Sequence, residues 1–276
     1  MSWYAHLRLE YVVEADRTVA RFRHEGPLRI LQSLYPEGPT VCHHVLVHPP
    51  GGLVGGDMLE IDLRVGPHAH GLITTPGATR FYRSAGEGAR QRTRLTLAAG
   101  ARLEWLPLET LCYDGCEAEN QLVMQLEPGA ELIGWDVTAL GLPESGLPFR
   151  RGQLLQHLEW PGVWLERARI RASDTRLLDG PLGLAGRRCW ASAFFVSGLP
   201  LARERRAALI EAARAVIEAH ALSPWAGATC PNERVVVVRL LAPLVEPAMQ
   251  LLQQIRAAWR QALWQLPPTA PRIWAM

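Results

Sequence analysis

Short segments in which hydrophobic and polar residues alternate dominate the chain from about residue 5 to residue 190. The clearest examples are 41–48, 58–65 and 91–97. Because successive side chains of a β-strand point to opposite faces, this alternation predicts half-buried strands. Turn-forming residues separate these segments, notably the glycine- and proline-rich stretch 49–56. This part of the chain is therefore predicted to be β-sheet.

A degenerate repeat runs through the same region. Three segments share the plan of strand, tight glycine-containing turn, and strand: 63–72, 95–105 and 123–135, with turn glycines Gly66, Gly100 and Gly129. Regular spacing of such units is typical of stacked β-structure that buries a common core. The period drifts, so the pattern predicts a β-sandwich or an irregular stacked sheet rather than a regular solenoid.

The last third of the chain changes its periodicity. Residues 201–221 have an apolar stripe at helical spacing, and 246–265 repeat this pattern after Pro247 near the first helical position. Between them, 234–241 form a continuous apolar run that fits a strand covered on both faces. The tail 271–276 is expected to be short and extended. The predicted fold class is mainly β, with stacked, sandwich-like sheets and two C-terminal α-helices.

The length of 276 residues fits one large domain, which can bury roughly 75% of its unfolded surface without a disulfide or metal. We expect a single domain over 1–276. Its β-rich part is expected at 1–195, with a helix–hairpin–helix part at 196–276 packed on it.

Composition narrows the class of protein. The net charge of +2 gives no general affinity for nucleic acid or membranes, and all 29 basic residues are arginine. Arginine suits fixed contacts at a protein interface, although a compositional bias of the genome explains the absence of lysine equally well.

The N-terminus lacks a signal-peptide core, and no stretch approaches the ~20 apolar residues of a membrane span. Five scattered cysteines without a CxxC pair indicate reduced thiols, so we expect a cytoplasmic protein.

Common catalytic motifs are missing from the sequence. It contains neither a GxSxG nucleophile elbow nor a GxxxxGK[ST] phosphate loop. The glycine cluster at 51–56 leads into a strand, so the helix N-terminus that would hold a phosphate is absent. A nucleotide-binding role is therefore disfavoured.

A group of histidines is the first candidate metal site. His68 and His70 are two residues apart on an expected strand, and His43 or His48 from a neighbouring strand could join them. Imidazole ligands suit nickel, copper or zinc. The simpler interpretation, which we favour, is that these are surface or hydrogen-bonded histidines.

Four acidic residues among apolar segments are the second candidate site. Buried carboxylates are costly unless they are paired or hydrogen-bonded. Each is either neutralised by an arginine or lines a polar passage or partner contact, and spacing alone favours the first interpretation. The four residues are Asp57, Glu104, Asp136 and Glu166, and the arginines considered as partners are Arg80, Arg83, Arg167 and Arg169.

Five motifs occur in order along the chain: HPPGGLVGGD at 48–57, LITTPGATRFYRS at 72–84, LEWLPLET at 103–110, ELIGWD at 131–136 with LGLP at 140–143, and PRIW at 271–274. Together these motifs resemble the UreD (UreH) family of urease accessory proteins. The resemblance covers nearly the whole chain. One departure is Leu108, where the family usually has glutamine, and any family role of a lysine has no counterpart here.

The resemblance implies a non-catalytic scaffold that binds urease apoprotein, contacts UreF and, through UreF, recruits the GTPase UreG for nickel insertion. It also implies a mostly β fold with two helices and allows a homodimer within the complex. Asp57, Glu104, Asp136 and Glu166 become candidates for a transient Ni²⁺ path, because weak oxygen ligation lets a metal bind and leave. No tightly bound cofactor is expected. The alternative is a metal-dependent β-sandwich enzyme that uses the histidine group.

Overall fold

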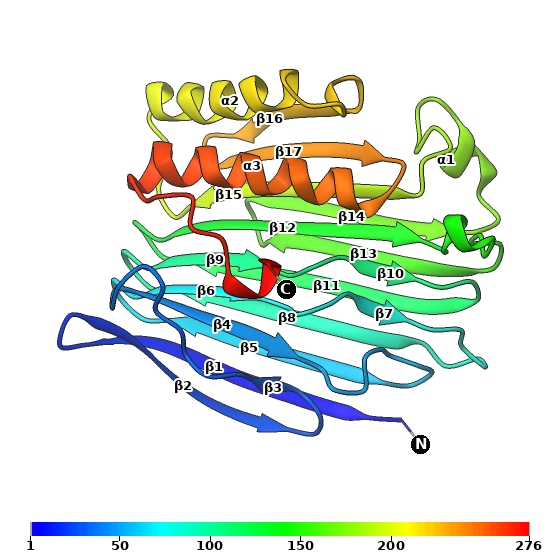
Figure 1. The fold of residues 1–276 in the computed structure, drawn as a ribbon, viewed down its shortest axis with the longest axis horizontal. Helices are drawn as coiled ribbons and strands as arrows, with labels where there is room; N and C mark the ends of the chain where they lie inside the picture. The colour runs from blue at the N-terminus through cyan, green and yellow to red at the C-terminus, as the bar shows by residue number, and fades with distance from the viewer. Residues whose placement is uncertain (1, 276) are drawn as a thin grey trace.

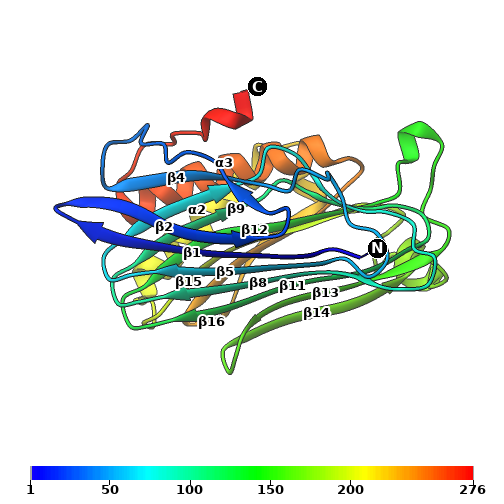
Figure 2. The ribbon, with the colours of Figure 1, turned by 90° about the horizontal axis from the view of Figure 1, so that it is seen from below.

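Two β-sheets stacked face to face form the body of the protein, and two long helices cover the outer face of the larger sheet (Figure 1). The computed structural model describes residues 2–275. The view from below shows the helices on one side and the smaller sheet on the other (Figure 2). The prediction of a mainly β fold with stacked sheets and two C-terminal helices is confirmed.

The smaller sheet has seven strands in the order β14-β13-β11-β8-β5-β1-β2. Their bounds are β1 Tyr4–Glu14, β2 Arg17–Glu25, β5 Met58–Val65, β8 Ala89–Leu97, β11 Cys116–Leu126, β13 Gly152–Trp160 and β14 Trp164–Arg171. Its five central strands run parallel, and the two edge strands are antiparallel to their neighbours.

The larger sheet has ten strands, with the main order β16-β17-β15-β12-β9-β6-β4-β3, and β10 joins β12 to β7. Their bounds are β3 Arg29–Ile30, β4 Val41–Val47, β6 His70–Thr74, β7 Thr79–Phe81, β9 Arg102–Leu106, β10 Thr110–Cys112, β12 Glu131–Leu140, β15 Cys189–Ser197, β16 Ala226–Asn232 and β17 Val235–Ala242. The helices are α1 Thr175–Asp179, α2 Arg203–Glu218 and α3 Val245–Trp264. The short α1 was not predicted.

The repeat seen in the sequence corresponds to a coil in which the chain passes from one sheet to the other. Strands β5, β8 and β11 lie side by side in the smaller sheet, and β6, β9 and β12 do so in the larger one. Equivalent positions stack in register, so Leu63 neighbours Leu95 and Leu95 neighbours Met124. The turns also stack, because the Ala98 amide donates to the Val65 carbonyl (2.9 Å). The irregular stacked sheet is therefore confirmed.

The ten-stranded sheet separates two hydrophobic cores. One lies between the sheets, and the other lies beneath α2 and α3 and contains Trp135, Phe195 and Trp259. In β17 the run 235–238 is buried throughout, which confirms the strand predicted to be covered on both faces. This sheet therefore has two buried faces on which polar groups require partners.

Two local predictions are wrong. Strand β4 was predicted to be half-buried, but its residues 41–46 are all buried. The smaller sheet covers one face, and the segment carrying Glu37, which contacts His43 of β4 and Arg260 of α3, lies on the other. The tail was predicted to be extended, but Arg272–Ala275 form a turn of 3₁₀ helix. Trp274 stacks on Trp135 with 5.6 Å between ring centroids, and this apolar contact holds the turn against the sheet.

Candidate functional site

Three amide side chains form a row across the inner face of the seven-stranded sheet. Gln91 on β8, Asn120 on β11 and Gln156 on β13 are cross-strand neighbours in the parallel register. We refer to these three residues as the amide ladder. Gln91 Nε2 donates to Asn120 Oδ1 over 3.4 Å. The ladder interrupts positions that are otherwise apolar on β11 and β13, so it places hydrogen-bonding groups inside the core.

Asp136 on β12 faces this ladder from the opposite sheet. Its carboxylate accepts hydrogen bonds from Asn120 Nδ2 (3.0 Å), from Thr138 Oγ1 (3.2 Å) and from Gln156 Nε2. Among the described residues, no arginine or histidine forms an ion pair with it. Burial raises the pKa of Asp136 and the three hydrogen bonds lower it, with a net pKa of about 6. Asp136 is thus a buried carboxylate without a neutralising cation.

Glu166 on β14 lies next to this group. Ser192, which is opposite Asp136 in the β12–β15 register, donates to Glu166 Oε2 over 3.0 Å. The negative charge of Glu166 contributes to the raised pKa of Asp136. Arg239 on β17 binds the other oxygen of Glu166 through Nε at 2.7 Å. The structure therefore brings two of the four candidate carboxylates together.

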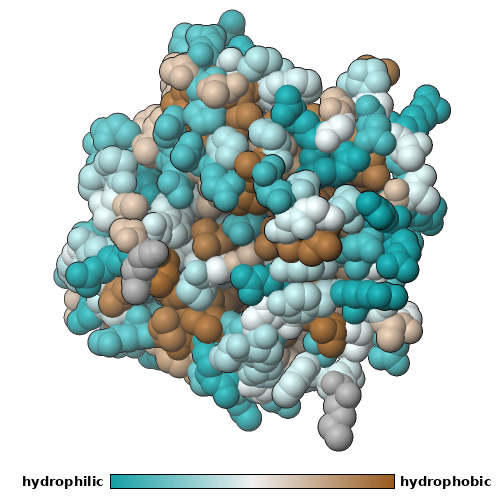
Figure 3. Space-filling model, turned by 45° about the vertical axis from the view of Figure 1, so that its right-hand side comes forward, coloured by the Kyte–Doolittle hydropathy of each residue, from teal (hydrophilic) through white to brown (hydrophobic). Residues whose placement is uncertain are grey.

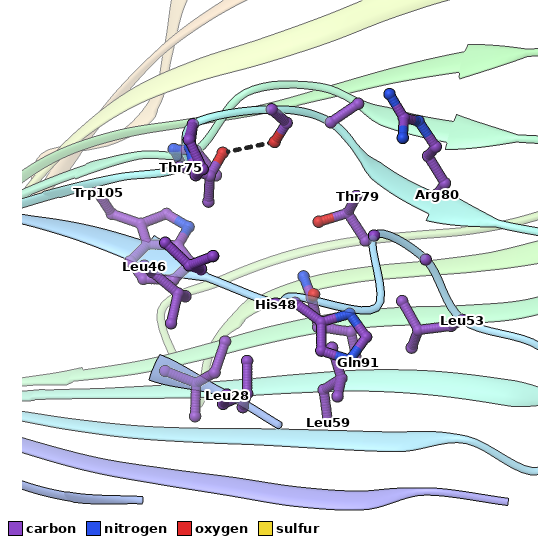
Figure 4. A pocket seen from close by; sticks show the side chains of 18 residues that line it. Leu28, Leu46, His48, Leu53, Leu59, Thr75, Thr79, Arg80, Gln91 and Trp105 are labelled. Atoms are coloured by element: carbon purple, nitrogen blue, oxygen red, sulfur yellow. Dashed lines mark hydrogen bonds between the residues drawn. The ribbon is translucent and has the colours of Figure 1, made fainter. Parts of the chain in front are cut away.

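The amide ladder extends from one hollow between the sheets to another. Gln91 lines a cavity of about 210 Å³ together with His48, Thr79 and Arg80 (Figure 4). Gln156 lines a second hollow of about 410 Å³ together with Glu166. Trp190 Nε1 holds Gln156 by donating to its Oε1 at 2.9 Å. A continuous line of polar side chains thus crosses an otherwise apolar interior.

Glu104 lies on the other face of the ten-stranded sheet, beneath α3. Arg256 Nε donates to one carboxylate oxygen at 2.6 Å, and Arg260 binds the other. Burial alone would raise the pKa of Glu104, but Arg256, the hydrogen bond with His70 and Arg260 together lower it to about 2. Arg260 also binds Glu37. Both oxygens of Glu104 are therefore engaged by fixed cations.

Asp57 is placed at the end of the glycine-rich stretch as a backbone anchor. Its Oδ1 accepts the Trp3 amide and its Oδ2 accepts the Val54 amide, both at 2.8 Å. The preceding Gly56 has φ +84°, a conformation that side-chain-bearing residues rarely adopt. Glycine at this position lets the chain turn back, so that the carboxylate of Asp57 can bind both amides.

The four candidate histidines have different surroundings. His43 Nε2 lies 2.7 Å from Glu37, His70 Nε2 lies 3.5 Å from Glu104, and His48 lines the first cavity. His68 lies in a turn with φ +60° rather than on a strand, so the prediction that it shares a strand face with His70 is wrong. Between residues 2 and 275 no group of three or more histidine, cysteine, aspartate or glutamate side chains is arranged to hold a metal ion.

Sequence reasoning named Asp136 and Glu166 but missed the amide ladder. The signal was present, because Asn120 and Gln156 occupy positions of an alternating strand pattern whose neighbours are apolar. A polar residue at such a position must find a buried partner. The four expected arginine partners form no ion pair with the candidate carboxylates in the described part of the chain. Arg239, Arg256 and Arg260 take that role instead.

Comparison with known proteins gives one consistent result. A family model described as UreD urease accessory protein matches residues 4–275. A urease accessory protein UreD of Variovorax paradoxus is 68% identical over 100% of both chains, and one of Polaromonas naphthalenivorans is 66% identical over 100% of both. A more distant relative of the same name, from Methylibium petroleiphilum, is 49% identical over 99% of each chain. None of the helices described between residues 2 and 275 is long and apolar enough to cross a membrane.

Proposed function

The chain belongs to the UreD family of urease accessory proteins, and from this premise we propose that it is a non-catalytic scaffold that passes Ni²⁺ to urease apoprotein. In this proposal the chain binds the apoprotein and UreF, and UreF connects it to the GTPase UreG. The metal is cargo rather than a resident cofactor. The complex acts in the cytoplasm.

The observation that carries the proposal is the line of polar side chains between the two hollows. A cation that crosses a protein interior needs oxygen ligands in place of water, and these ligands must bind weakly enough to release it. The amide oxygens of the ladder and the carboxylate of Asp136 supply such ligands, and carboxylates and amide carbonyls are hard, exchangeable donors. Glu166 offers a second carboxylate at the edge of the second hollow.

The charge of the Asp136 carboxylate supports an interaction with a passing Ni²⁺ ion. Its pKa of about 6 leaves the carboxylate ionised near neutral pH, without a cation in contact to compete for it. A passing Ni²⁺ therefore gains a favourable interaction there. Asp57 and Glu104 were candidates for the same path, but both oxygens of Asp57 bind backbone amides and both oxygens of Glu104 bind buried arginines. Asp136 has no arginine partner within residues 2–275 and only one oxygen of Glu166 binds an arginine, so the proposed route uses these two residues.

Metal delivery to urease provides the test. Urease subunits and the accessory proteins are co-expressed with nickel in the medium, and nickel per urease is measured by mass spectrometry beside urease activity. Asp136→Asn, alone and with Glu166→Gln, is expected to lower nickel content at least tenfold while the complex with urease still co-purifies. Glu159→Gln, which removes an outward carboxylate from β13, is the matched control and should be neutral.

Two outcomes would contradict the proposal in different ways. Full nickel content in the Asp136→Asn/Glu166→Gln variant would exclude these carboxylates as the route. Failure of the wild-type chain to co-purify with urease subunits would exclude the scaffold role itself.

A further inference from the structure

The outer face of the seven-stranded sheet carries charged side chains rather than a covering layer. On β1, β5 and β8 the outward residues Arg8, Glu10, Arg64 and Arg94 are exposed. Parallel sheets usually have both faces covered by other elements, so an open parallel face of this size is unusual. On the face of the molecule seen in Figure 3, apolar side chains form patches among polar ones.

The largest of the hollows described lies on this face and contains an excess of arginine. Its volume is about 660 Å³, compared with about 410 Å³ for the hollow beside Glu166. Only two carboxylates, Glu10 and Asp62, line it. We refer to the hollow as the arginine hollow and define it by Arg8, Arg21, Arg23, Arg64 and Arg94.

Three of these arginines have no acidic partner within the part of the chain that the structure describes. Arg94 pairs with Asp62 at 3.3 Å and Arg21 pairs with Glu14 at 2.7 Å. The remaining three are Arg8, Arg23 and Arg64. Asp62 is shared with His6, whose Nε2 lies 2.7 Å away, and in all two carboxylates face the five arginines of the hollow.

The register makes this arrangement unfavourable for the isolated protein. Arg8 on β1 and Arg23 on β2 are direct cross-strand partners, and like charges in that position repel. The register also places Asp62 beside Arg8 and Glu10 beside Arg64, so the unfavourable contact is the one between Arg8 and Arg23. Arginines on an edge strand commonly prevent sheet-to-sheet aggregation, which accounts for Arg167 and its neighbours on β14. That explanation does not extend to Arg8 and Arg64, because β1 and β5 are paired on both sides.

We propose that the arginine hollow is a docking site for an acidic segment of a partner protein. Guanidinium groups bind carboxylates through paired hydrogen bonds, and an acidic segment would neutralise the charges that repel one another in the free chain. The hollow spans four strands, roughly 14 Å, which matches four or five residues of extended peptide. The net charge of only +2 gives the chain no general affinity for the phosphate backbone of a nucleic acid, which favours a peptide as the occupant.

A binding measurement with a defined probe tests this proposal. Fluorescein-labelled hexaglutamate is titrated with the full-length chain, and anisotropy is recorded at 50 and 150 mM salt. The Arg8→Gln/Arg23→Gln/Arg64→Gln variant should bind at least tenfold more weakly. The Arg167→Gln/Arg169→Gln/Arg171→Gln variant removes the same charge from exposed positions of β14 and should stay within twofold of wild type.

Equal loss in both variants would show that only net charge matters and would overturn the proposal, as would undetectable binding by the wild-type chain. Hexathymidylate serves as the competing probe. If it binds as tightly as hexaglutamate and is lost with the same triple variant, the hollow is a phosphate site and not a docking site for an acidic peptide.

Thermal unfolding separates binding from a structural role. Arg23→Gln removes one of two opposed charges, so the Tm of the free chain should rise by about 1–3 °C at low salt and the difference should vanish in 0.5 M salt. The same variant should bind hexaglutamate more weakly. A fall in Tm would assign Arg23 a structural contact and count against the proposal.

Discussion

Glu104 and Asp136 are buried carboxylates on opposite faces of the same sheet, and their surroundings shift their pKa values in opposite directions. Glu104 is fully buried under α3 and contacts two arginines, which hold its pKa at about 2. Asp136 is 9% exposed between the sheets and contacts only amide and hydroxyl groups, and its pKa is about 6. Glu104 joins helix α3 to the sheet through ion pairs, whereas Asp136 forms no ion pair with a described residue.

The difference shows that burial alone does not identify a functional carboxylate. Removing either charge from water is costly, but fixed cations offset this cost only for Glu104. A group whose charge is costly in the free protein, and which is nevertheless hydrogen-bonded in place, is a better candidate for handling a ligand. By this criterion Asp136 is the strongest candidate among the four acidic residues that the sequence offered.

The largest effect is expected at the helix-side carboxylate. Glu104→Gln leaves Arg256 and Arg260 buried with one negative charge fewer, so the free energy of unfolding should fall by about 3–5 kcal/mol, measured by chemical denaturation. In the wild-type chain the folded pKa of about 2 lies below the ordinary value of 4.5. Its stabilisation is therefore complete above pH 4.5 and is lost as pH falls toward 2. If the free energy of unfolding of the variant falls by less than 1 kcal/mol, Glu104 does not stabilise the fold through its arginines and does not differ from Asp136 in this respect.

An effect of opposite sign is expected between the sheets. Because the pKa of Asp136 is raised from 3.8 to about 6, its ionisation destabilises the fold progressively as pH rises through this interval. Asp136→Asn removes this cost and should stabilise the protein by about 3 kcal/mol above pH 6, and by nearly nothing below pH 4. Denaturation at pH 4 and pH 7.5 measures both limits. Destabilisation at pH 7.5 would mean that Asp136 is a structural group.

The smallest effect is expected at the ion pair between Glu166 and Arg239, whose side chains are 22% and 49% exposed. Exposed pairs contribute little, so Arg239→Gln should change the free energy of unfolding by less than about 1 kcal/mol, and by less still in 0.5 M salt. If the free energy of unfolding falls by more than 2 kcal/mol, this ion pair stabilises the fold as strongly as the buried ion pairs of Glu104 do.

The sequence was sufficient for the fold class, for several strands and for the names of the acidic residues. Alternation located strands such as β4, β5 and β8, and helical spacing located both long helices, because these patterns are local. The partners were not predictable in this way. Arg256 is 152 residues from Glu104, and Gln156 is 20 residues from Asp136 but on a different sheet, so each contact depends on register and packing. The buried state of β4 was missed for the same reason.

The ion pairs beneath α3 also bear on the order in which the chain can complete its fold during synthesis. Arg260 binds Glu37 and Glu104, which precede it by 223 and 156 residues. Domains fold as the chain emerges from the ribosome, N-terminal part first. Until the last helix has emerged, both carboxylates lack their cations and the face that carries them is open to water. A nascent chain that stops short of α3 is therefore expected to expose this face to chaperones and proteases, so that only complete chains persist.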